Sequence, residues 1–257
     1  MSKITAIRPR KHLIIPDTQH GPGIDDEHFK WIGLYIADKQ PDVVIHLGDH
    51  WDMPSLSSYD RGRRSAENRR YHEDIAAGNL AIKKLMAGMA SSGGARWKKP
   101  ELHYLLGNHE NRIERYVEDH AELEGTLSYK AFYLPGWQVH GFLDPVQIDG
   151  ILYSHYFYNP KSGRPWTGNA HNIGQKVGQS CVMGHRQGLD FGYIARPTKE
   201  DICVVAGSCY RHVEKYRGPQ AAKHWNGIIM LHDVGNGTSA PSIMSVTLDY
   251  LARRYRR

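Results

Sequence analysis

Side chains able to bind metal ions recur in this sequence directly after short apolar runs. Carboxylate and amide oxygens together with imidazole nitrogens form a mixed ligand shell, which suits Mn²⁺, Mg²⁺, Fe or Zn²⁺ rather than soft thiolate chemistry. Two such cations can lower the pKa of a shared water and neutralise an attacked phosphate. The metal-competent residues, in chain order, are Asp17 with Gln19, Asp49, Asn108 with His109, His155, and His185 with Gln187.

The apolar runs before these residues are predicted to be β-strands. They occupy residues 12–16, 43–47, 102–106, 146–153 and 180–183. Further strands are expected at 202–206, 228–233 and 242–248, and helical spacing of apolar residues predicts helices at 29–37, 75–89 and 111–118. Short strands alternating with helices indicate an α/β layered fold, in which sites form beyond the carboxyl ends of strands.

The remaining segments carry weaker patterns. Residues 57–70 are polar and strongly basic, which predicts a loop or an exposed helix start. Residues 91–94, Ser-Ser-Gly-Gly, predict a break in secondary structure after the helix at 75–89. Residues 161–178 begin with a stretch rich in Gly, Asn and Pro, and are therefore the best candidate for a mobile loop. The basic tail at 252–257 is expected to fray.

The composition is that of an ordinary globular protein with a basic balance. A length of 257 residues suffices for a full core, and one domain spanning 1–257 is expected. The formal charge of +6 is compatible with a polyanionic partner such as nucleic acid. On charge alone, a generically basic surface with no such partner is an equally good interpretation. Three cysteines without zinc spacing indicate a reducing compartment. No stretch is apolar enough to span a bilayer, so a cytosolic protein without a membrane partner is expected.

The order of the metal-competent residues resembles the calcineurin-like metallophosphoesterase superfamily, whose pattern reads D-x-H, GD, GNH-[DE], H and GH-x-H. Each piece alone is a weak signal, but five in this order, each after a predicted strand, are a strong one. The corresponding pieces of this chain are Asp17-x-Gln19, Gly48-Asp49, Gly107-Asn108-His109-Glu110, His155 and Gly184-His185-x-Gln187.

The resemblance implies two mixed β-sheets packed as a sandwich flanked by helices, with two divalent cations, Mn²⁺ before Mg²⁺, Fe or Zn²⁺. Asp49 would bridge the two cations, and a bridging hydroxide would attack phosphorus in line. His109 would contact the phosphate and protonate the leaving oxygen as a general acid. The other implied ligands are Asp17, Gln19 and Gln187 at the first cation, and Asn108, His155 and His185 at the second.

The chain departs from the family pattern at the first cation. Gln19 and Gln187 stand where the pattern has histidines, and an amide oxygen is a harder and usually weaker ligand than imidazole. This exchange favours Mn²⁺ or Mg²⁺ over Zn²⁺ or Fe. The alternative is a weak first site and impaired activity. The presence of Asp49 and His109 favours a working centre, because a purely structural descendant would have little need of either.

The substrate class is narrowed by comparison with branches of the superfamily. Ser/Thr protein phosphatases carry Arg-Gly after their GD-x-x-D segment, whereas Met53-Pro54 follows here. Repair nucleases usually carry an additional C-terminal capping region, and only residues 188–257 follow the last motif. A compact phosphodiesterase acting on DNA, RNA or nucleotides is therefore expected, similar to short phage-encoded members. A broad phosphomonoesterase and a metal-binding protein without turnover are the alternatives, and the arginines at 61–70 would hold a nucleic-acid backbone if they line the cleft.

Overall fold

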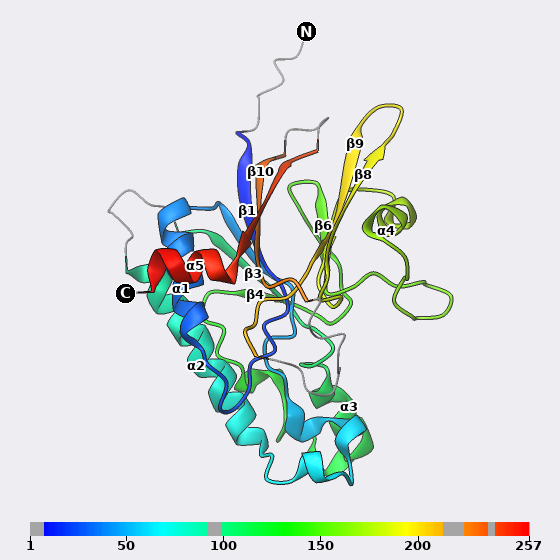
Figure 1. The fold of residues 1–257 in the computed structure, drawn as a ribbon. Coiled ribbons are helices and arrows are strands. Elements are labelled where there is room, and N and C mark those ends of the chain that lie inside the picture. The colour runs from blue at the N-terminus through cyan, green and yellow to red at the C-terminus, as the bar shows by residue number, and fades with distance from the viewer. Residues whose placement is uncertain (1–7, 92–98, 213–223, 236–239, 257) are drawn as a thin grey trace.

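Two mixed β-sheets form the centre of the computed structural model, which describes residues 8–91, 99–212, 224–235 and 240–256 (Figure 1). Among these residues, the first sheet contains β1 (Arg10–Ile15), β2 (Val43–His46), β3 (Glu101–Leu105), β4 (Gln138–His140), β10 (Gly227–Val234) and β11 (Ser242–Thr247), in the order β11-β10-β1-β2-β3-β4. The second contains β5 (Val146–Ile148), β6 (Ile151–Ser154), β7 (Cys181–Met183), β8 (Leu189–Ala195) and β9 (Glu200–Ala206), in the order β5-β6-β7-β9-β8.

The strands that precede the candidate ligands are parallel within each sheet. β1, β2 and β3 pair in parallel, and so do β6, β7 and β9. The four residues of β2 are all buried, which fits a strand covered on both faces. Because parallel strands end at the same edge of a sheet, this topology brings their following loops together.

The core between the two sheets is made of aliphatic side chains from both. Ile14, Ile45 and Ile229 of the first sheet pack in one cluster with Val182 and Val204 of the second. This shared cluster confirms the expected arrangement of two mixed sheets packed on each other with helices outside.

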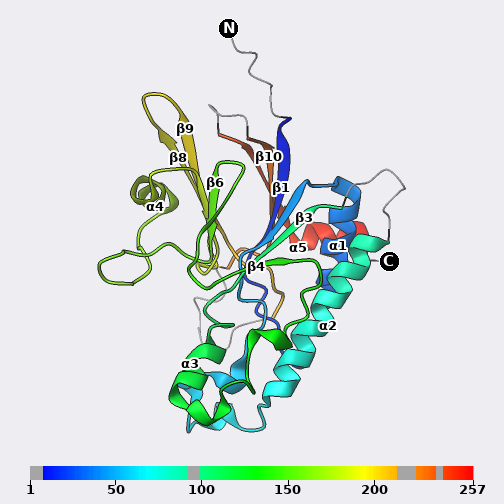
Figure 2. The same ribbon diagram turned by 180° about the vertical axis from the view of Figure 1, so that it is seen from behind.

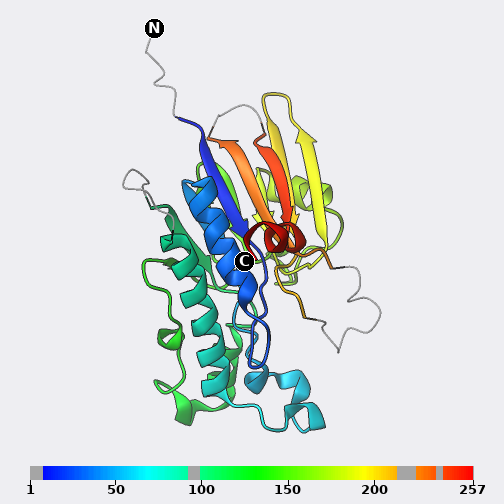
Figure 3. The same ribbon diagram turned by 60° about the vertical axis from the view of Figure 1, so that its left-hand side comes forward.

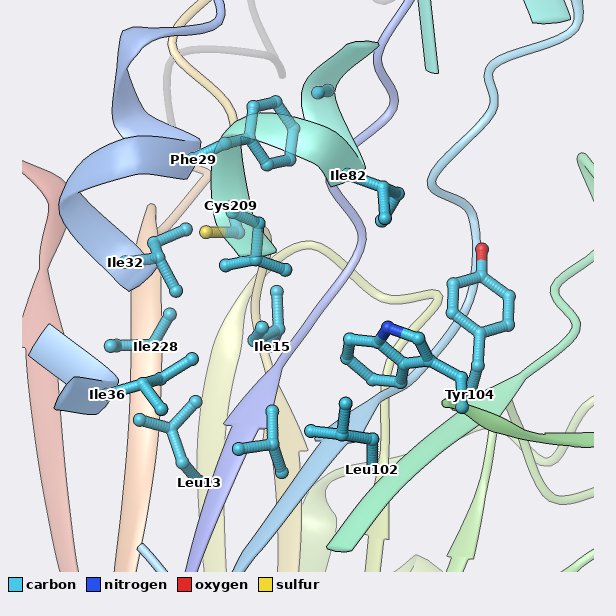
Figure 4. Close-up of a cluster of buried hydrophobic side chains, with 14 of the residues drawn as sticks. Leu13, Ile15, Phe29, Ile32, Ile36, Ile82, Leu102, Tyr104, Cys209 and Ile228 are labelled. Atoms are coloured by element: carbon cyan, nitrogen blue, oxygen red, sulfur yellow. The ribbon is translucent and has the colours of Figure 1, made fainter. Parts of the chain in front are cut away.

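Helices α1 (Glu27–Lys39), α2 (Tyr71–Ala90) and α5 (Leu248–Tyr255) cover the outer face of the first sheet. Phe29, Ile32 and Ile36 recur at helical spacing on the buried face of α1, and Ile36 lies beside Leu13 and Ile228 of the sheet (Figure 4). Figure 3 shows α1 and α2 running side by side.

The outer face of the second sheet is covered by α4 (Ala170–Val177), which packs through Ile173 on Cys203 and Val205. Helix α3 (Arg112–Asp119) lies apart from both layers. It sits beyond the carboxyl ends of the strands of the first sheet, as Figures 1 and 2 show from opposite sides.

The structure corrects three expectations about local structure. Residues 146–153 form a hairpin, not one strand, because Asp149 (φ 49°) and Gly150 (φ 87°) both take the left-handed conformation of a tight turn. The second half of the predicted mobile loop is α4, whose N-cap Asn169 accepts a hydrogen bond from the backbone N–H of Asn172. The predicted frayed tail is helical to Tyr255, whose hydroxyl donates to Asp38 over 2.8 Å.

Other segments differ in detail from expectation. The basic stretch at 57–70 forms short 3₁₀ turns, and β4 and β8 were not predicted. Residues 92–94 of the predicted break lie outside the described residues. None of the described helices is both long and apolar enough to cross a membrane.

Candidate metal centre

The loops after four of the strands bring candidate ligands into one cluster. Ligand atoms of Asp49, His155 and His185 all lie within 4.8 Å of one another. The side-chain oxygen of Asn108 joins them, 2.9 Å from His155 Nε2 and 2.8 Å from His185 Nδ1. The structure therefore groups Asp49, the carboxylate expected to bridge, with all three residues expected at the second cation.

The ring of His155 is fixed by a backbone hydrogen bond. Its Nδ1 donates to the carbonyl oxygen of Leu47 over 2.7 Å, so Nε2 points at Asp49 Oδ2, 3.4 Å away, and at the oxygen of Asn108. Burial alone would lower the pKa of His155, but the charge of Asp49 raises it to about 9. His155 is therefore protonated at neutral pH, and its Nε2 proton lies among the oxygens of Asp49 and Asn108. A backbone carbonyl on the far nitrogen is the usual support of a metal-binding histidine.

Asp49 is held from several sides at the tip of its loop. It is buried and has a left-handed φ of 51°. Glu110, also buried, accepts hydrogen bonds from the backbone N–H groups of Asp49 (2.9 Å), His50 (2.6 Å) and Trp51 (3.0 Å). Burial by itself raises the pKa of Asp49, yet the charges of His109 and His155 bring it well below the usual aspartate value. Asp49 is therefore an ionised carboxylate in a rigid position.

Asp17 approaches the cluster from the end of β1. Its Oδ1 accepts the backbone N–H of His185 over 2.9 Å, and its buried Oδ2 has no hydrogen-bond partner among the described residues. Burial raises the pKa of Asp17 to about 7, with the charge of Asp49 adding to the effect. A buried carboxylate oxygen without a donor is costly, which makes it a natural position for a cation.

The two glutamines are both buried but differ in their contacts. The backbone N–H of Gln19 donates to the carbonyl oxygen of Asp49 over 2.7 Å, and its Oε1 lacks a partner in the described part of the chain. The Oε1 of Gln187 instead accepts from the hydroxyl of Tyr210 over 3.0 Å, which leaves its buried Nε2 without one. Turning this amide by 180° would place the oxygen in the unpaired position and let the nitrogen donate to Tyr210, whose hydroxyl lies 2.6 Å from His224 Nδ1.

His109 lies beside the cluster with a different set of contacts. Its backbone N–H donates to Asp49 Oδ1 over 2.8 Å, and its Nδ1 bonds Asp52 Oδ1 over 2.7 Å. Its Nε2 is 3.7 Å from Asp49 Oδ2 and 3.3 Å from Arg112 Nη2. Burial and the charge of Arg112 both lower the pKa of His109, but the charge of Asp49 and the hydrogen bond to Asp52 outweigh them and raise it above the ordinary histidine value. A protonated imidazole oriented by a carboxylate can donate a proton.

Histidines near the motifs do not join the cluster. His20, next to Gln19, packs edge-on against Phe29, and burial lowers its pKa to about 4. His50, next to Asp49, bonds the hydroxyl of Thr18 over 2.7 Å and the carbonyl oxygen of Gly78 over 2.9 Å through its two ring nitrogens. Both stabilise the loops that carry the site.

Arg112 is a residue of the site that the sequence analysis missed. Its Nη1 donates to the carbonyl oxygens of Asp52 (2.6 Å) and Met53 (3.2 Å) while Nη2 reaches His109. The available signal was its position, because Arg112 follows His109 by three residues and stands at the start of the helix predicted at 111–118.

Three of the predicted ligands have strained backbone conformations. Gln19 (φ 36°), Asp49 (φ 51°) and His185 (φ 65°) are all in the left-handed region, which costs of order 1–3 kcal/mol for each such residue. Strain of this kind persists only where the surrounding structure enforces it, and such residues gather at functional sites.

Comparison with known proteins gives no family assignment. No family model matches the chain. The chain is 26% identical over 204 residues to the Gene 54 protein of Mycobacterium phage D29, and 24% identical over 203 residues to the Gene 54 protein of Mycobacterium phage L5. Each alignment covers 70% of this chain and 71% of the relative. One solved structure aligns with 93% of this chain and 99% of its own length at a TM-score of 0.44 and 12% identity, which does not establish a shared fold.

Proposed function

We propose that this chain is a metal-dependent phosphoesterase of the calcineurin-like type, which hydrolyses phosphodiester bonds of nucleic acid or nucleotides with two divalent cations. One observation carries the proposal. Ligand atoms of Asp49, Asn108, His155 and His185 face one another, and the buried Asp17 Oδ2 has no donor among the described residues. A buried cluster built from hydrogen-bond acceptors and imidazoles has too few donors to satisfy its own oxygens, and bound cations would satisfy them.

The donor set suits the expected metals. Two carboxylates, an amide and two imidazoles supply oxygen and nitrogen, and the unpaired Oε1 of Gln19 adds a further neutral oxygen. Hard oxygen ligands at the first position favour Mn²⁺ or Mg²⁺. When bound, the two cations would lower the pKa of a water and neutralise charge on the phosphate.

The residues around the cluster have separate tasks in this proposal. Asp52 bonds Nδ1 of His109, which leaves Nε2 to carry the proton that the leaving oxygen needs. The guanidinium of Arg112 can only donate, so Nε2 accepts from its Nη2 in this structure. With substrate bound, Nη2 would donate to a phosphate oxygen instead and leave Nε2 to carry the proton. Glu110 holds the Asp49 loop through backbone hydrogen bonds and has no contact with substrate in this scheme.

Hydrolysis of two chromogenic esters tests the proposal. Bis-p-nitrophenyl phosphate is a diester and p-nitrophenyl phosphate a monoester, and we expect the manganese-loaded protein to hydrolyse the diester faster. Asp49→Asn should abolish activity and reduce the bound manganese, whereas Asp249→Asn, which changes an exposed carboxylate of α5, should change neither. Faster hydrolysis of the monoester would identify a phosphomonoesterase. Manganese binding without hydrolysis of either ester would identify a metal-binding protein without turnover.

A further inference from the structure

A cavity of about 230 Å³ opens beside the candidate metal centre, between α3 and the 3₁₀ turns at Pro54–Leu56 and Ser58–Asp60. None of the roles assigned above uses it. We call it the arginine pocket, and its charged and aromatic lining includes Tyr59, Arg61, Arg112, Arg115, Tyr116 and Asp119.

The arginine pocket adjoins His109, the residue proposed to protonate the leaving oxygen. Arg112 belongs to both, because its side chain lines the pocket while its Nη2 lies 3.3 Å from His109 Nε2. Two backbone carbonyls hold the other end of the same guanidinium, so this wall of the pocket is fixed relative to His109. Whatever occupies the pocket is therefore next to the group that protonates the leaving oxygen.

The lining has the chemistry of a nucleotide site. Arg112 and Arg115 are three residues apart in α3 and share a face of the helix. Tyr59 is 76% exposed, so its ring is open to a stacking partner, whereas Tyr116 stacks on His120 at a centroid distance of 4.2 Å. Guanidinium groups beside accessible aromatic rings are the combination by which proteins hold phosphate and stack a base.

Charge along α3 limits how much of a polymer fits. Arg112 and Arg115 stand in its first half, where Glu114 lies outside the pocket lining, and Glu118 and Asp119 line the pocket at the far end of the helix. Asp119 pairs with Arg61 over 3.6 Å, but both side chains are more than half exposed, so this pair does not close the pocket strongly. Acidic groups at the far end repel a continuing phosphate backbone, and the volume lies below the roughly 300–1,000 Å³ of typical ligand sites. The pocket therefore suits one nucleoside unit.

The neighbouring cavity does not offer the same chemistry. It encloses about 450 Å³ and is lined by two arginines, Arg69 and Arg70, and three carboxylates, Asp52, Glu73 and Asp74. The arginine pocket has the opposite balance, with three arginines and two carboxylates. The basic run at 61–70 is thus divided between two cavities, which argues against one continuous surface for a nucleic-acid backbone.

We propose that the arginine pocket binds the nucleoside on the leaving-oxygen side of the scissile phosphodiester. The base lies against Tyr59, Arg115 donates to oxygens of that nucleoside, and the scissile phosphate lies toward Arg112. This assignment rests on the proposed function and adds its substrate class, a nucleotide diester with a nucleoside leaving group. Because the pocket recognises the leaving group, a diester that expels a small alcohol should gain nothing from it.

A pair of substrates with equally poor leaving groups isolates the pocket. Thymidylyl-thymidine expels a nucleoside, and the methyl esters of thymidine 3′- and 5′-phosphate expel methanol. Cleavage of the dinucleotide leaves either thymidine 3′-phosphate or thymidine 5′-phosphate. The methyl ester of the same phosphate is the matched control, because it differs only in the leaving group. In manganese-loaded wild-type protein, kcat/KM should be roughly tenfold or more higher for the dinucleotide than for its matched ester.

Variants of the pocket should lower this ratio. Tyr59→Ala and Arg115→Ala should each reduce it by roughly tenfold, because each removes one contact to the leaving nucleoside. Tyr193→Ala, which truncates another exposed tyrosine on the distant β8, should leave the ratio unchanged. A ratio near one in the wild type, or a ratio unchanged in both pocket variants, would overturn the assignment.

Failure of the proposed function is distinguishable from failure of the pocket. If the wild type hydrolyses no ester, the proposed function falls, and calorimetric titration of manganese-loaded protein with the dinucleotide then decides the pocket. Tighter binding to wild type than to Tyr59→Ala and Arg115→Ala would support the pocket. Equal binding, or none, would overturn it.

Discussion

Binding of a divalent cation to this centre should release protons at neutral pH, because two of its residues hold protons in the metal-free protein. His155 donates from Nδ1 to the carbonyl of Leu47, and its Nε2 faces the oxygens of Asp49 and Asn108, so both ring nitrogens act as donors. The ring is therefore an imidazolium, and it must lose the Nε2 proton before that nitrogen can bind a metal.

The size of the effect follows from the two raised pKa values. With a pKa of about 9, His155 is almost fully protonated at pH 7, and Asp17, with a pKa of about 7, is about half protonated. Binding at pH 7 should release about 1.5 protons in total from these two residues. The pKa of His155 lies about two units above pH 7, so a proton competes with the cation for Nε2. This competition weakens cation binding at pH 7 by roughly 3 kcal/mol.

The sign of the pH dependence is fixed by which form binds. The neutral imidazole is the ligand, so rising pH removes the competing proton and strengthens binding. The apparent association constant should rise about tenfold per pH unit between pH 7 and 9 and level off above the pKa of His155.

Titration calorimetry with Mn²⁺ measures the release directly. The observed enthalpy at one pH varies linearly with the protonation enthalpy of the buffer, and the slope is the number of protons released. His155→Asn should release about one proton fewer than wild type, whereas His232→Asn, on β10, should match wild type. No release at pH 7, or an affinity independent of pH, would show that His155 is neutral before binding or is not a ligand.

Three further outcomes test other parts of the site. Gln19→His combined with Gln187→His should shift metal content toward Zn²⁺ after reconstitution with equal Mn²⁺ and Zn²⁺, and an unchanged content would remove both glutamines from the ligand set. His109→Asn should lose far more rate on alkyl diesters than on p-nitrophenyl diesters with metal content unchanged, because only the poor leaving group needs a proton; equal losses would leave His109 a purely positioning role. Asp52→Asn should lower the pKa of His109, so the fall in the rate of alkyl-diester hydrolysis at high pH should begin roughly one pH unit lower. If the pH of this fall is unchanged, a group other than His109 causes it.

The order of strands and ligands could be predicted from the sequence because each buried parallel strand leaves a continuous apolar run. β2, with all four residues buried, is the clearest example. Strand β4 could not be predicted in this way, because Gln138 and Val139 are exposed and only three residues pair with β3. The hairpin of β5 and β6 was mistaken for one strand, although its Asp149-Gly150 pair is the residue pair typical of a two-residue hairpin turn and could have revealed it.

The candidate ligands could be named from the sequence, but their supports could not. The carbonyl of Leu47 that orients His155 and the hydroxyl of Tyr210 that contacts Gln187 carry no sequence pattern, because backbone carbonyls and distant side chains become partners only through the fold. The same holds for the arginine pocket, which joins α3 to turns some fifty residues earlier in the chain.

Two glycines of the sequence motifs are required by the packing of the candidate ligands. A Cβ on Gly107 would lie 2.2 Å from Asp49 Oδ1, and one on Gly184 would lie 2.5 Å from Asp17 Oδ1. Both distances are shorter than any real contact, so the carboxylates occupy space that only glycine leaves open. The motif pairs thus have a geometric origin, in which a loop backbone approaches a carboxylate closely, as well as a chemical one. Neither close approach involves the side chain of Gln19 or Gln187, so a different residue at either position would leave the packing of these two carboxylates unchanged.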